Sequence, residues 1–368
     1  MHEVVMSVSS PTERQLITSF VDALRELPEV EADLDHWEPA RPGDRGYDAQ
    51  VDLHVAGKSY VLLIEAKKAV FPRDVRQVLW QLREASLGRS AEQGKEPFSL
   101  LVAESISPGA KEMLRSERVG YYDSGGSLYL PARGAYLYID KPPPKTLAKS
   151  MRSLFSGRRA QVLHALLVRH DDWFGVTGLA QEAMVSPATA SQVLSELERF
   201  DWLTARGQGP AKERHLREPS ALLDAWAKQL ATIRPPTVRR YYVPGTKTDA
   251  LEARIGQVFG AHDVAYAISH EAAAQRYTPF LSNVSQVRAR VLGSANADAA
   301  IGELNARPVS EGANFSVIEA KSLGELLFRE QLGDLWLASP IQIYLDLLRG
   351  EGRAKEMAEH FRKERIGF

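Results

Sequence analysis

The chain has 368 residues, of which 44% are hydrophobic and 25% are charged, and its formal net charge is -1 at pH 7. At about 100–200 residues per domain, this length predicts two or three domains. The near-zero net charge excludes a uniformly basic protein, so any nucleic-acid binding must come from a local basic patch. The absence of cysteine excludes disulfides, thiolate metal sites and a cysteine nucleophile.

Nothing in the sequence indicates export or membrane insertion. The stretch MHEVVMSVSSPTERQ has no basic region followed by a long apolar run, so it does not predict a signal peptide. No segment approaches the roughly 18 apolar residues that a membrane span needs. We therefore expect a cytoplasmic protein that does not contact the membrane.

Two proline-rich stretches divide the chain, KPPPKTLAKSMRSLFSGRR at 141–159 and IRPPT at 233–237. Proline can neither continue a helix interior nor donate to a sheet, so both stretches are typical of connections. They predict an α/β multidomain protein with a mixed α/β domain at each end and a helical domain between them. The predicted boundaries are 1–140, a basic proline-rich linker at 141–157, 158–232 and 237–368.

The first segment predicts an α/β sandwich around a mixed sheet, in the order αββαβαββ. Its first helix carries an apolar face and begins after Thr12, a suitable N-cap residue. The predicted helices and strands that follow it are strands at 51–56 and 59–67, a helix at 73–88, a strand at 97–105, a helix at 107–118 and a hairpin at 119–140.

The second strand, YVLLIEAKK, ends with charged residues although its first half is apolar. With the turn placed at 57–58, Asp52 faces Leu63, and directly opposed residues share one face of the sheet. Because side chains alternate, Asp52 then lies diagonal to Glu65 on the face that also carries Lys67. Two carboxylates can bind Mg²⁺ through oxygen, and a bound metal lowers the pKa of its water. A loop one residue longer would abolish this arrangement.

This D-x12-E-x-K pattern, after a helix that carries Glu13, resembles the PD-(D/E)XK nucleases, which include restriction endonucleases and Holliday-junction resolvases. The resemblance implies a restriction-endonuclease-like core of order αβββαβ, of which one strand before Asp52 is missing or very short here. It implies catalytic roles for Asp52, Glu65 and Lys67, with Asp52 and Glu65 as metal ligands. Glu13 and either Gln77 or Gln81 match the assisting residues.

The pattern is incomplete, since Val51 stands where the family has proline, although Asp48 lies on the same side by parity. A solvated strand end explains the same charges without any site. Many relatives of this fold keep the scaffold as a DNA-binding or structural module. We therefore rank a non-catalytic domain ahead of an active, Mg²⁺-dependent one.

Residues 176–207 resemble a winged helix-turn-helix, preceded by a predicted helix at 158–170 and followed by two short strands and a helix. Ser186 is a suitable N-cap of the third helix, and Pro187 fits its first position. Short polar side chains there suit recognition in a major groove. The predicted contacts are Ser186, Thr189, Ser191 and Gln192 on this helix and Arg206, Lys212, Arg214 and Arg217 on the wing.

Charge supports an interaction with double-stranded DNA, because residues 141–159 hold six basic residues and no acidic one. Neutralisation of phosphates supplies most non-specific affinity for DNA. The predicted phosphate contacts in this arm are Lys149, Arg152, Arg158 and Arg159. The acidic residues Glu196, Glu198 and Asp201 weaken the argument, and a helical domain that binds only proteins is the alternative.

The stretch WLASPIQIYLDLLRGEGRAKEMAEHFRKERI at 336–366 resembles the C-terminal domain of AbiEi-like antitoxins, which are transcriptional regulators of type IV toxin-antitoxin systems. The segment 263–281 resembles an earlier helical part of the same domain. The matching residues are Ser339, Pro340, Gln342, Tyr344, Asp346, Leu347, Gly350 and Gly352. The same residues also make an ordinary capped helix with a core stripe.

The resemblances together imply a DNA-binding transcriptional regulator, and they imply a cognate nucleotidyltransferase-like toxin as a partner. Regulation by DNA binding requires no cofactor. The enzyme alternative is a Mg²⁺-dependent endonuclease that the winged helix targets. A homodimer would suit a palindromic operator, although the sequence leaves the oligomeric state open.

Overall fold

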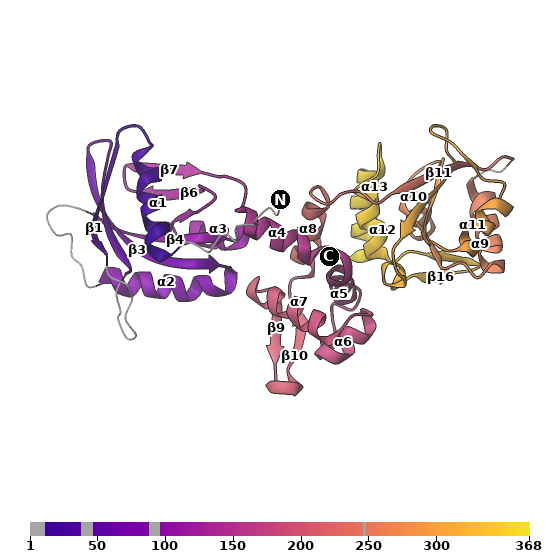
Figure 1. Cartoon of the computed structure of the whole chain (residues 1–368), viewed down its shortest axis with the longest axis horizontal. Coiled ribbons are helices and arrows are strands. Elements are labelled where there is room, and N and C mark those ends of the chain that lie inside the picture. Colours follow the sequence, from indigo (N-terminus) through magenta and orange to yellow (C-terminus); the bar gives the residue numbers. More distant parts are fainter. Residues whose placement is uncertain (1–11, 38–46, 88–95, 246–247) are drawn as a thin grey trace, which may run out of the picture. The chain divides into compact units, whose positions relative to one another are not determined.

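The structure is a computed structural model that describes residues 12–37, 47–87, 96–245 and 248–368 (Figure 1). Residues 1–151 together with 198–201 form one compact unit, and residues 152–197 together with 202–368 form another. Within the described ranges, no helix combines the length and apolarity that a membrane crossing requires.

The first unit is an α/β sandwich whose described residues include a seven-stranded sheet of order β1-β2-β3-β4-β5-β6-β7. Strands β3, β4 and β5 are parallel, whereas the other neighbours are antiparallel. The elements are α1 (Glu13–Arg25), β1 (Val30–Trp37), β2 (Ala49–Val55), β3 (Lys58–Val70), α2 (Pro72–Leu87), β4 (Glu96–Ile106), α3 (Pro108–Ser116), β5 (Gly120–Asp123), β6 (Leu128–Ala132) and β7 (Ala135–Ile139).

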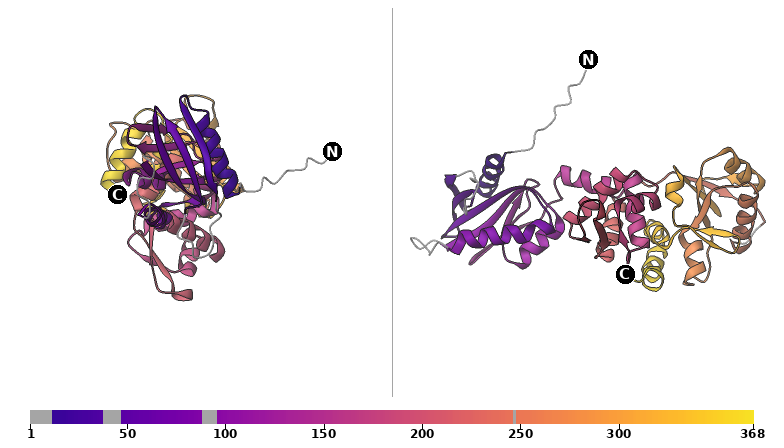
Figure 2. Two further views of the ribbon diagram at one scale, coloured as in Figure 1. Left: turned by 90° about the vertical axis from the view of Figure 1, so that its left-hand side faces the viewer. Right: turned by 90° about the horizontal axis from the view of Figure 1, so that it is seen from below.

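Helices cover both faces of this sheet (Figure 2). On one face, Phe20 and Leu24 of α1 pack into a core with Leu62 and Ile64 of β3. On the other face, α2 and α3 share a second core with residues of β4, β5 and β6. A sheet buried on both faces explains the continuous apolar run in β3, since neither face of that strand is exposed to water.

Helix α1 begins where the sequence predicts it. The Thr12 hydroxyl accepts a hydrogen bond from the Gln15 N–H at 3.3 Å, and the Gln15 side chain accepts one from the Thr12 N–H at 2.7 Å. This reciprocal pair is a capping box, which satisfies two N–H groups that the helix itself leaves open. The predicted N-cap is therefore confirmed.

The strand predicted to be missing before Asp52 is present, and that expectation was wrong. Strand β1 pairs antiparallel with β2, with a register shift between Leu34 and His36. Its sequence VEADLDHW alternates charged and apolar residues, as expected of an edge strand with one exposed face. The observed order of the first six elements is α1-β1-β2-β3-α2-β4.

The predicted register of the hairpin was also wrong. Asp52 faces Val61 rather than Leu63, and Val55 faces Lys58, so the turn lies at 56–57. The shift is two residues, which preserves the face on which each side chain lies but moves every partner along the strand. The predicted linker 141–157 is likewise not all coil, because it contains the helix α4 (Lys145–Leu154).

The N-terminal part of the second unit is helical, with a three-stranded sheet of order β8-β10-β9 among its described residues. Strand β8 was not predicted. Helix α7 begins at Pro187, and the Ser186 hydroxyl accepts a hydrogen bond from the Thr189 N–H at 3.2 Å, as the sequence suggests. The elements are α5 (Gly157–Val168), β8 (Trp173–Phe174), α6 (Val176–Glu182), α7 (Pro187–Arg199), β9 (Leu203–Arg206), β10 (Glu213–Leu216) and α8 (Pro219–Leu230).

The C-terminal part contains a mixed sheet of order β14-β11-β15-β13-β12-β17-β16 among the described residues. Helices α9 and α11 lie on one side of it, and α10, α12 and α13 gather on the other (Figure 1). The elements are β11 (Val238–Tyr242), α9 (Thr248–Ala261), β12 (Tyr266–Ser269), α10 (His270–Tyr277), β13 (Val287–Leu292), α11 (Ala295–Glu303), β14 (Arg307–Pro308), β15 (Phe315–Ala320), β16 (Glu330–Leu332), β17 (Leu335–Leu337), α12 (Pro340–Leu347) and α13 (Ala354–Phe361).

Candidate functional sites

Asp48, directly before β2, and Glu65, in β3, form a buried acidic pair. Asp48 donates its backbone N–H to the Ile64 carbonyl at 2.7 Å, and its Oδ2 accepts the Ala66 N–H at 2.7 Å. The exposed fractions of Asp48 and Glu65 are only 3% and 4%. The Nζ of Lys67 forms an ion pair with Glu65. Asp48, Glu65 and Lys67 therefore make the trio that the sequence pattern anticipates, with Asp48 in place of Asp52.

The environment of this trio disfavours negative charge. Burial raises the pKa of Asp48, although the Ala66 N–H and Lys67 oppose it. Burial also raises the pKa of Glu65; Lys67 opposes this shift, whereas the charges of Asp48 and Glu13 add to it. Two carboxylates that are buried together with raised pKa values are typical of functional sites, because a stable fold gains nothing from them.

The other residues predicted for this site lie farther away or point to solvent. Asp52 is half-buried and faces Val61, and its four-residue separation from Asp48 corresponds to about 13 Å along the strand. Glu13 is exposed at the start of α1, from where its charge still reaches Glu65. Gln77 is exposed on α2, whereas the Oε1 of Gln81 is buried and has no hydrogen-bond partner among the described residues.

The trio fits one hard divalent cation and no larger cluster. In the described ranges, no group of three or more His, Asp or Glu side chains is placed to hold a metal ion. Mg²⁺, however, is commonly held by one or two carboxylates and keeps several waters. Asp48 and Glu65 are two such carboxylates, and Lys67 already forms an ion pair with Glu65.

Helix α7 buries one face and exposes polar residues at its N-terminal end. Its core side is formed by Ala190, Val193, Leu194 and Leu197. Ser186 and Gln192 are exposed, whereas Thr189 and Ser191 are half-buried. The hydroxyls of Ser186 and Thr189 lie 2.9 Å apart and are hydrogen-bonded to each other, and the Ser186 hydroxyl also accepts the Thr189 N–H.

Several cations of the predicted wing are already engaged. Arg206 donates to Glu213 at 2.8 Å, and its guanidinium carbon lies 4.1 Å from the centroid of the Trp173 ring. Arg217 donates to Glu218 at 3.2 Å. Arg214 is only 7% exposed, so the structure places it inside the wing rather than on its surface. Lys212 is half-buried.

The predicted phosphate contacts in residues 141–159 also fall into two groups, exposed cations and a cation that already has protein partners. Lys149, Arg152 and Arg158 are exposed. Arg159 forms an ion pair with Glu196 and donates to the Ser153 hydroxyl at 3.2 Å. We therefore consider Lys149, Arg152 and Arg158 better placed than Arg159 to meet an external phosphate.

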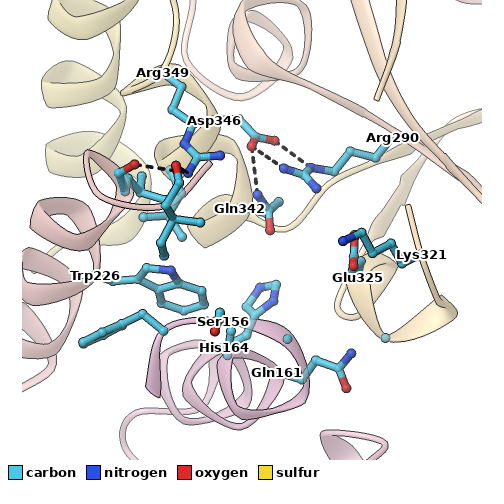
Figure 3. A pocket seen from close by; sticks show the side chains of 17 residues that line it. Ser156, Gln161, His164, Trp226, Arg290, Lys321, Glu325, Gln342, Asp346 and Arg349 are labelled. Atoms are coloured by element: carbon cyan, nitrogen blue, oxygen red, sulfur yellow. Dashed lines mark hydrogen bonds and ion pairs between the residues drawn. The ribbon is translucent and has the colours of Figure 1, made fainter. Parts of the chain in front are cut away.

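A polar cavity of about 280 Å³ lies between the helical part and the C-terminal part of the second unit, with Trp226 and His164 on one wall and Asp346 and Arg290 on the other (Figure 3). Arg290 binds Asp346 bidentately, at 2.9 Å through Nε and 2.5 Å through a terminal nitrogen. Ser269 and Gln342 also donate to Asp346, at 2.5 Å and 2.9 Å. Three side chains thus donate four hydrogen bonds to one buried carboxylate.

Burial and the charges of this network shift the pKa values of Asp346 and His164. Burial alone would raise the pKa of Asp346, but the charge and hydrogen bonds of Arg290 hold that pKa well below its usual range. Burial, together with the positive charge of Arg290, lowers the pKa of His164 to about 4. The ring of His164 is hydrogen-bonded to the Ser339 hydroxyl at 2.5 Å, which joins α5 to the start of α12.

Most members of this network were missed by sequence reasoning. Ser339, Gln342 and Asp346 belong to the stretch that carries the AbiEi resemblance, but Arg290 and His164 belong to distant segments that offered no local pattern. One feature of the sequence could have indicated that Asp346 is buried and paired: it lies on a helix whose other residues form a core stripe. A carboxylate on such a face must be paired when it is buried.

Comparison with known proteins supports one of the resemblances. Comparisons with curated proteins and with solved structures gave no match. Residues 215–366 match the family described as "Transcriptional regulator, AbiEi antitoxin, Type IV TA system". The match begins in β10, and it includes α8, the cavity residues Arg290 and Asp346, and both C-terminal helices. The predicted resemblance of the C-terminal part to AbiEi antitoxins and regulators is therefore confirmed for residues 215–366.

Proposed function

We propose that the protein is a DNA-binding transcriptional regulator of the type IV antitoxin kind, which binds operator DNA through residues 157–216. The observation that carries this proposal is the family match of residues 215–366, next to a domain of winged-helix order. In that order, three helices are followed by a two-stranded wing that a short third strand completes.

The geometry of α7 supports a role in the major groove. Gln192 is exposed on the side away from the apolar face, and at the N-terminal end Ser186 is exposed and Thr189 is half-buried. In helix-turn-helix proteins, residues at this end of the second helix contact base edges. The acidic residues Glu196 and Glu198 lie in the other half of the helix, so the bases would meet the neutral half.

Phosphate contacts would come from the exposed cations Lys149, Arg152 and Arg158, and from Arg206 at the wing. The Arg206–Glu213 pair is largely exposed, and such pairs contribute little to stability, so DNA can displace it at low cost. The first unit would then serve as a further DNA-binding or oligomerisation module. The family description, an antitoxin of a type IV toxin-antitoxin system, supports a cognate toxin as the partner. We propose that this toxin is nucleotidyltransferase-like, and a homodimer would match a palindromic operator.

The test is a mobility shift with the DNA upstream of the protein's own reading frame, measured at several salt concentrations. We expect binding that weakens as salt rises, because released counterions drive it. Replacing Thr189 and Gln192 by Ala should reduce the affinity for this DNA about tenfold or more relative to random DNA, since base contacts contribute about 1–3 kcal/mol each. Ser195→Ala, on the same helix, is the control. No shift at low salt would refute the proposal.

The buried trio supports a second candidate, a Mg²⁺-dependent DNA endonuclease. Asp48 and Glu65 would hold the metal, which supplies a water of lowered pKa and screens the scissile phosphate. Lys67 would orient that water or stabilise the developing charge. The element order α1-β1-β2-β3-α2-β4 agrees with the αβββαβ core of the PD-(D/E)XK fold, which adds support.

Plasmid cleavage in the presence of Mg²⁺ or Mn²⁺ separates the two candidates. If the protein is an endonuclease, Asp48→Asn and Glu65→Gln should abolish cleavage, whereas Asp52→Asn should leave it within a few fold of the original rate. Cleavage with this pattern would place the enzyme ahead of the regulator. Absence of cleavage by the unaltered protein leaves the regulator as the better account.

A further inference from the structure

A second cavity of about 170 Å³ lies in the C-terminal part, beside the network of Figure 3, and shares Asp346 and Arg349 with it. Its wall includes three arginines from three different places: Arg240 on β11, Arg288 on β13 and Arg349 directly after α12. The neutral polar groups in the wall are His270, Gln286 and Ser316. The family match does not explain why so many donors line so small a space.

His270 is the most unusual residue of this wall. It is the first residue of α10, and its backbone has a left-handed φ of 57°. A non-glycine residue in this region costs about 1–3 kcal/mol, and such strain is concentrated at functional positions. The side chain is only 7% exposed, yet Nδ1 has no hydrogen-bond partner among the described residues. A buried polar atom of this kind needs a partner, and the cavity is where one can sit.

Two of the arginines are fixed in place by their neighbours. Arg288 donates to the Gln286 side chain at 2.8 Å and to Glu271 at 3.3 Å, while Gln286 donates to the Ser316 hydroxyl at 3.0 Å. Arg349 donates through one terminal nitrogen to the carbonyls of Leu230 and Ile233 at 3.2 Å and 3.3 Å. Preorganised donors lose little freedom when they bind a ligand, which favours affinity.

The charge around the cavity favours an anion. Asp346 lines the cavity, but Arg290 already neutralises it through two hydrogen bonds. Glu351 is an exposed acid on the wall, and Glu271 pairs with Arg288. Within the part of the chain that the structure describes, the hydrogen bonds of Arg349 go to carbonyls. Burial lowers the pKa of its guanidinium, and the charge of Asp346, which Arg290 already neutralises, opposes that shift. The side chain of Ser269, the N-cap of α10, donates to Asp346 and does not cap this helix, whose N-terminus carries partial positive charge.

We propose that this cavity binds the phosphoryl group of a small molecule, held by Arg240, Arg288 and Arg349 with His270 as an additional hydrogen-bonding group. Three guanidinium groups from three elements suit a group with several charged oxygens. Pockets for drug-sized ligands usually measure about 300–1,000 Å³, so a cavity of about 170 Å³ suits one phosphoryl group rather than a whole nucleotide. Any larger part of the ligand would lie outside the cavity. This inference is independent of DNA binding.

Calorimetric titration of the full chain tests the site with three probes: inorganic phosphate, adenosine 5′-monophosphate and adenosine, each against sodium chloride of equal ionic strength. We expect phosphate to bind and adenosine not to bind. Tighter binding of the monophosphate than of phosphate would identify a phosphorylated metabolite as the source, and equal binding would identify free phosphate. Failure of both phosphorylated probes to bind beyond the chloride control would overturn the proposal.

Variants locate the binding. Arg288→Gln and Arg240→Gln should each weaken phosphate binding about tenfold, as expected for loss of one charge-assisted hydrogen bond. Arg240 is exposed, so its replacement should leave folding intact even if Arg288→Gln does not. Arg307→Gln changes an exposed arginine of β14 outside the cavity and should bind phosphate as the unaltered chain does. Unchanged affinity in Arg240→Gln and Arg288→Gln would show an adventitious ion only and refute the site.

Discussion

Buried charges in this protein are of two kinds, which differ in whether a partner neutralises them. Asp346 is surrounded by four donors, two of them from Arg290, and is held ionised. Asp48 and Glu65 face each other, with Lys67 as their nearby cation, and their pKa values are raised by burial. The first kind supports the fold, whereas the second kind reduces stability, which is why Asp48 and Glu65 are the candidate site.

The acidic pair gives a prediction about stability. A raised folded-state pKa means that the folded protein binds protons more readily than the unfolded chain, so its stability falls as pH rises above the ordinary carboxylate range. Asp48→Asn removes one charge and keeps an oxygen that can accept the Ala66 N–H. We expect the midpoint of thermal unfolding at pH 7 to rise by roughly 2–4 °C, for about 1 kcal/mol. Scanning calorimetry at pH 7 and pH 4 measures it.

The control for that experiment is Asp52→Asn, which changes a half-buried aspartate on the same strand. It should not reproduce the increase. A fall in the midpoint for Asp48→Asn would show that the carboxylate is structurally required, and it would remove the argument that the pair is a functional site.

The two buried histidines predict a loss of stability in mild acid. Burial lowers the folded-state pKa of His164 and of His270 to about 4, so the unfolded chain binds protons more readily over the range from about 6.5 down to 4. The stability is complete above that range and decreases through it. The expected decrease is about 2 kcal/mol for each histidine at pH 5. Urea unfolding at pH 8 and pH 5 measures it, and His164→Gln should reduce the difference by about half. Equal stability at both pH values would contradict the assignment.

At the scale of elements, helix starts followed from local sequence, whereas strand pairing did not. Thr12, Ser186 and Ser339 each cap the helix that the sequence predicts after them. Caps depend on residues within one turn, so a single sequence contains the necessary information. Strand β1 was missed because its alternating charges, typical of an edge, resemble those of a loop.

The candidate site was predictable only in part, for the same reason. Glu65 and Lys67 lie on one strand, and their spacing alone places them on one face. The identity of the second carboxylate depends on the register with β2. The predicted turn leaves Asp48 and Asp52 both diagonal to Glu65, whereas the observed register, with Ala49 opposite Ile64, brings Asp48 next to Glu65 and moves Asp52 farther away. The polar cavity could not be predicted, since His164, Arg290 and Asp346 are brought together by tertiary packing alone.

The cap of α12 gives a prediction at this scale. Ser339 accepts the Gln342 N–H at 3.1 Å and is also hydrogen-bonded to the buried ring of His164. Ser339→Ala therefore removes a cap and leaves a buried nitrogen unpaired, which together should cost about 2–3 kcal/mol. Ser294→Ala removes only a cap, from α11, where the hydroxyl accepts the Ala297 N–H at 3.1 Å. That control should cost about 1 kcal/mol. Equal losses in denaturant unfolding would refute the role given to His164.

At the scale of the whole molecule, the helical part and the C-terminal part of the second unit belong to one compact unit, although the proline-rich stretch at 233–237 lies between them in sequence. Arg362 donates to Asp224 at 2.6 Å, Arg349 donates to the Leu230 carbonyl, and His164 is hydrogen-bonded to Ser339. These bonds join α5 and α8 to the C-terminal helices. A proline-rich stretch alone is therefore weak evidence that the parts on either side of it are independent domains, because polar contacts in the fold can join them.

This organisation predicts two separate unfolding transitions in the intact chain. Residues 152–197 and 202–368 should unfold together, and the first unit should unfold on its own. Asp346→Ala leaves Arg290 buried without its partner, and breaking such a pair costs about 3–5 kcal/mol, so it should lower one calorimetric transition strongly. The other transition should stay in place and should be the one that Asp48→Asn moves. If Asp346→Ala instead lowers only part of its transition, and the helical part from α5 to α8 unfolds independently, the contacts between α5, α8 and α12 do not couple the two parts. A ligand in the C-terminal part could then not influence the proposed DNA binding through them.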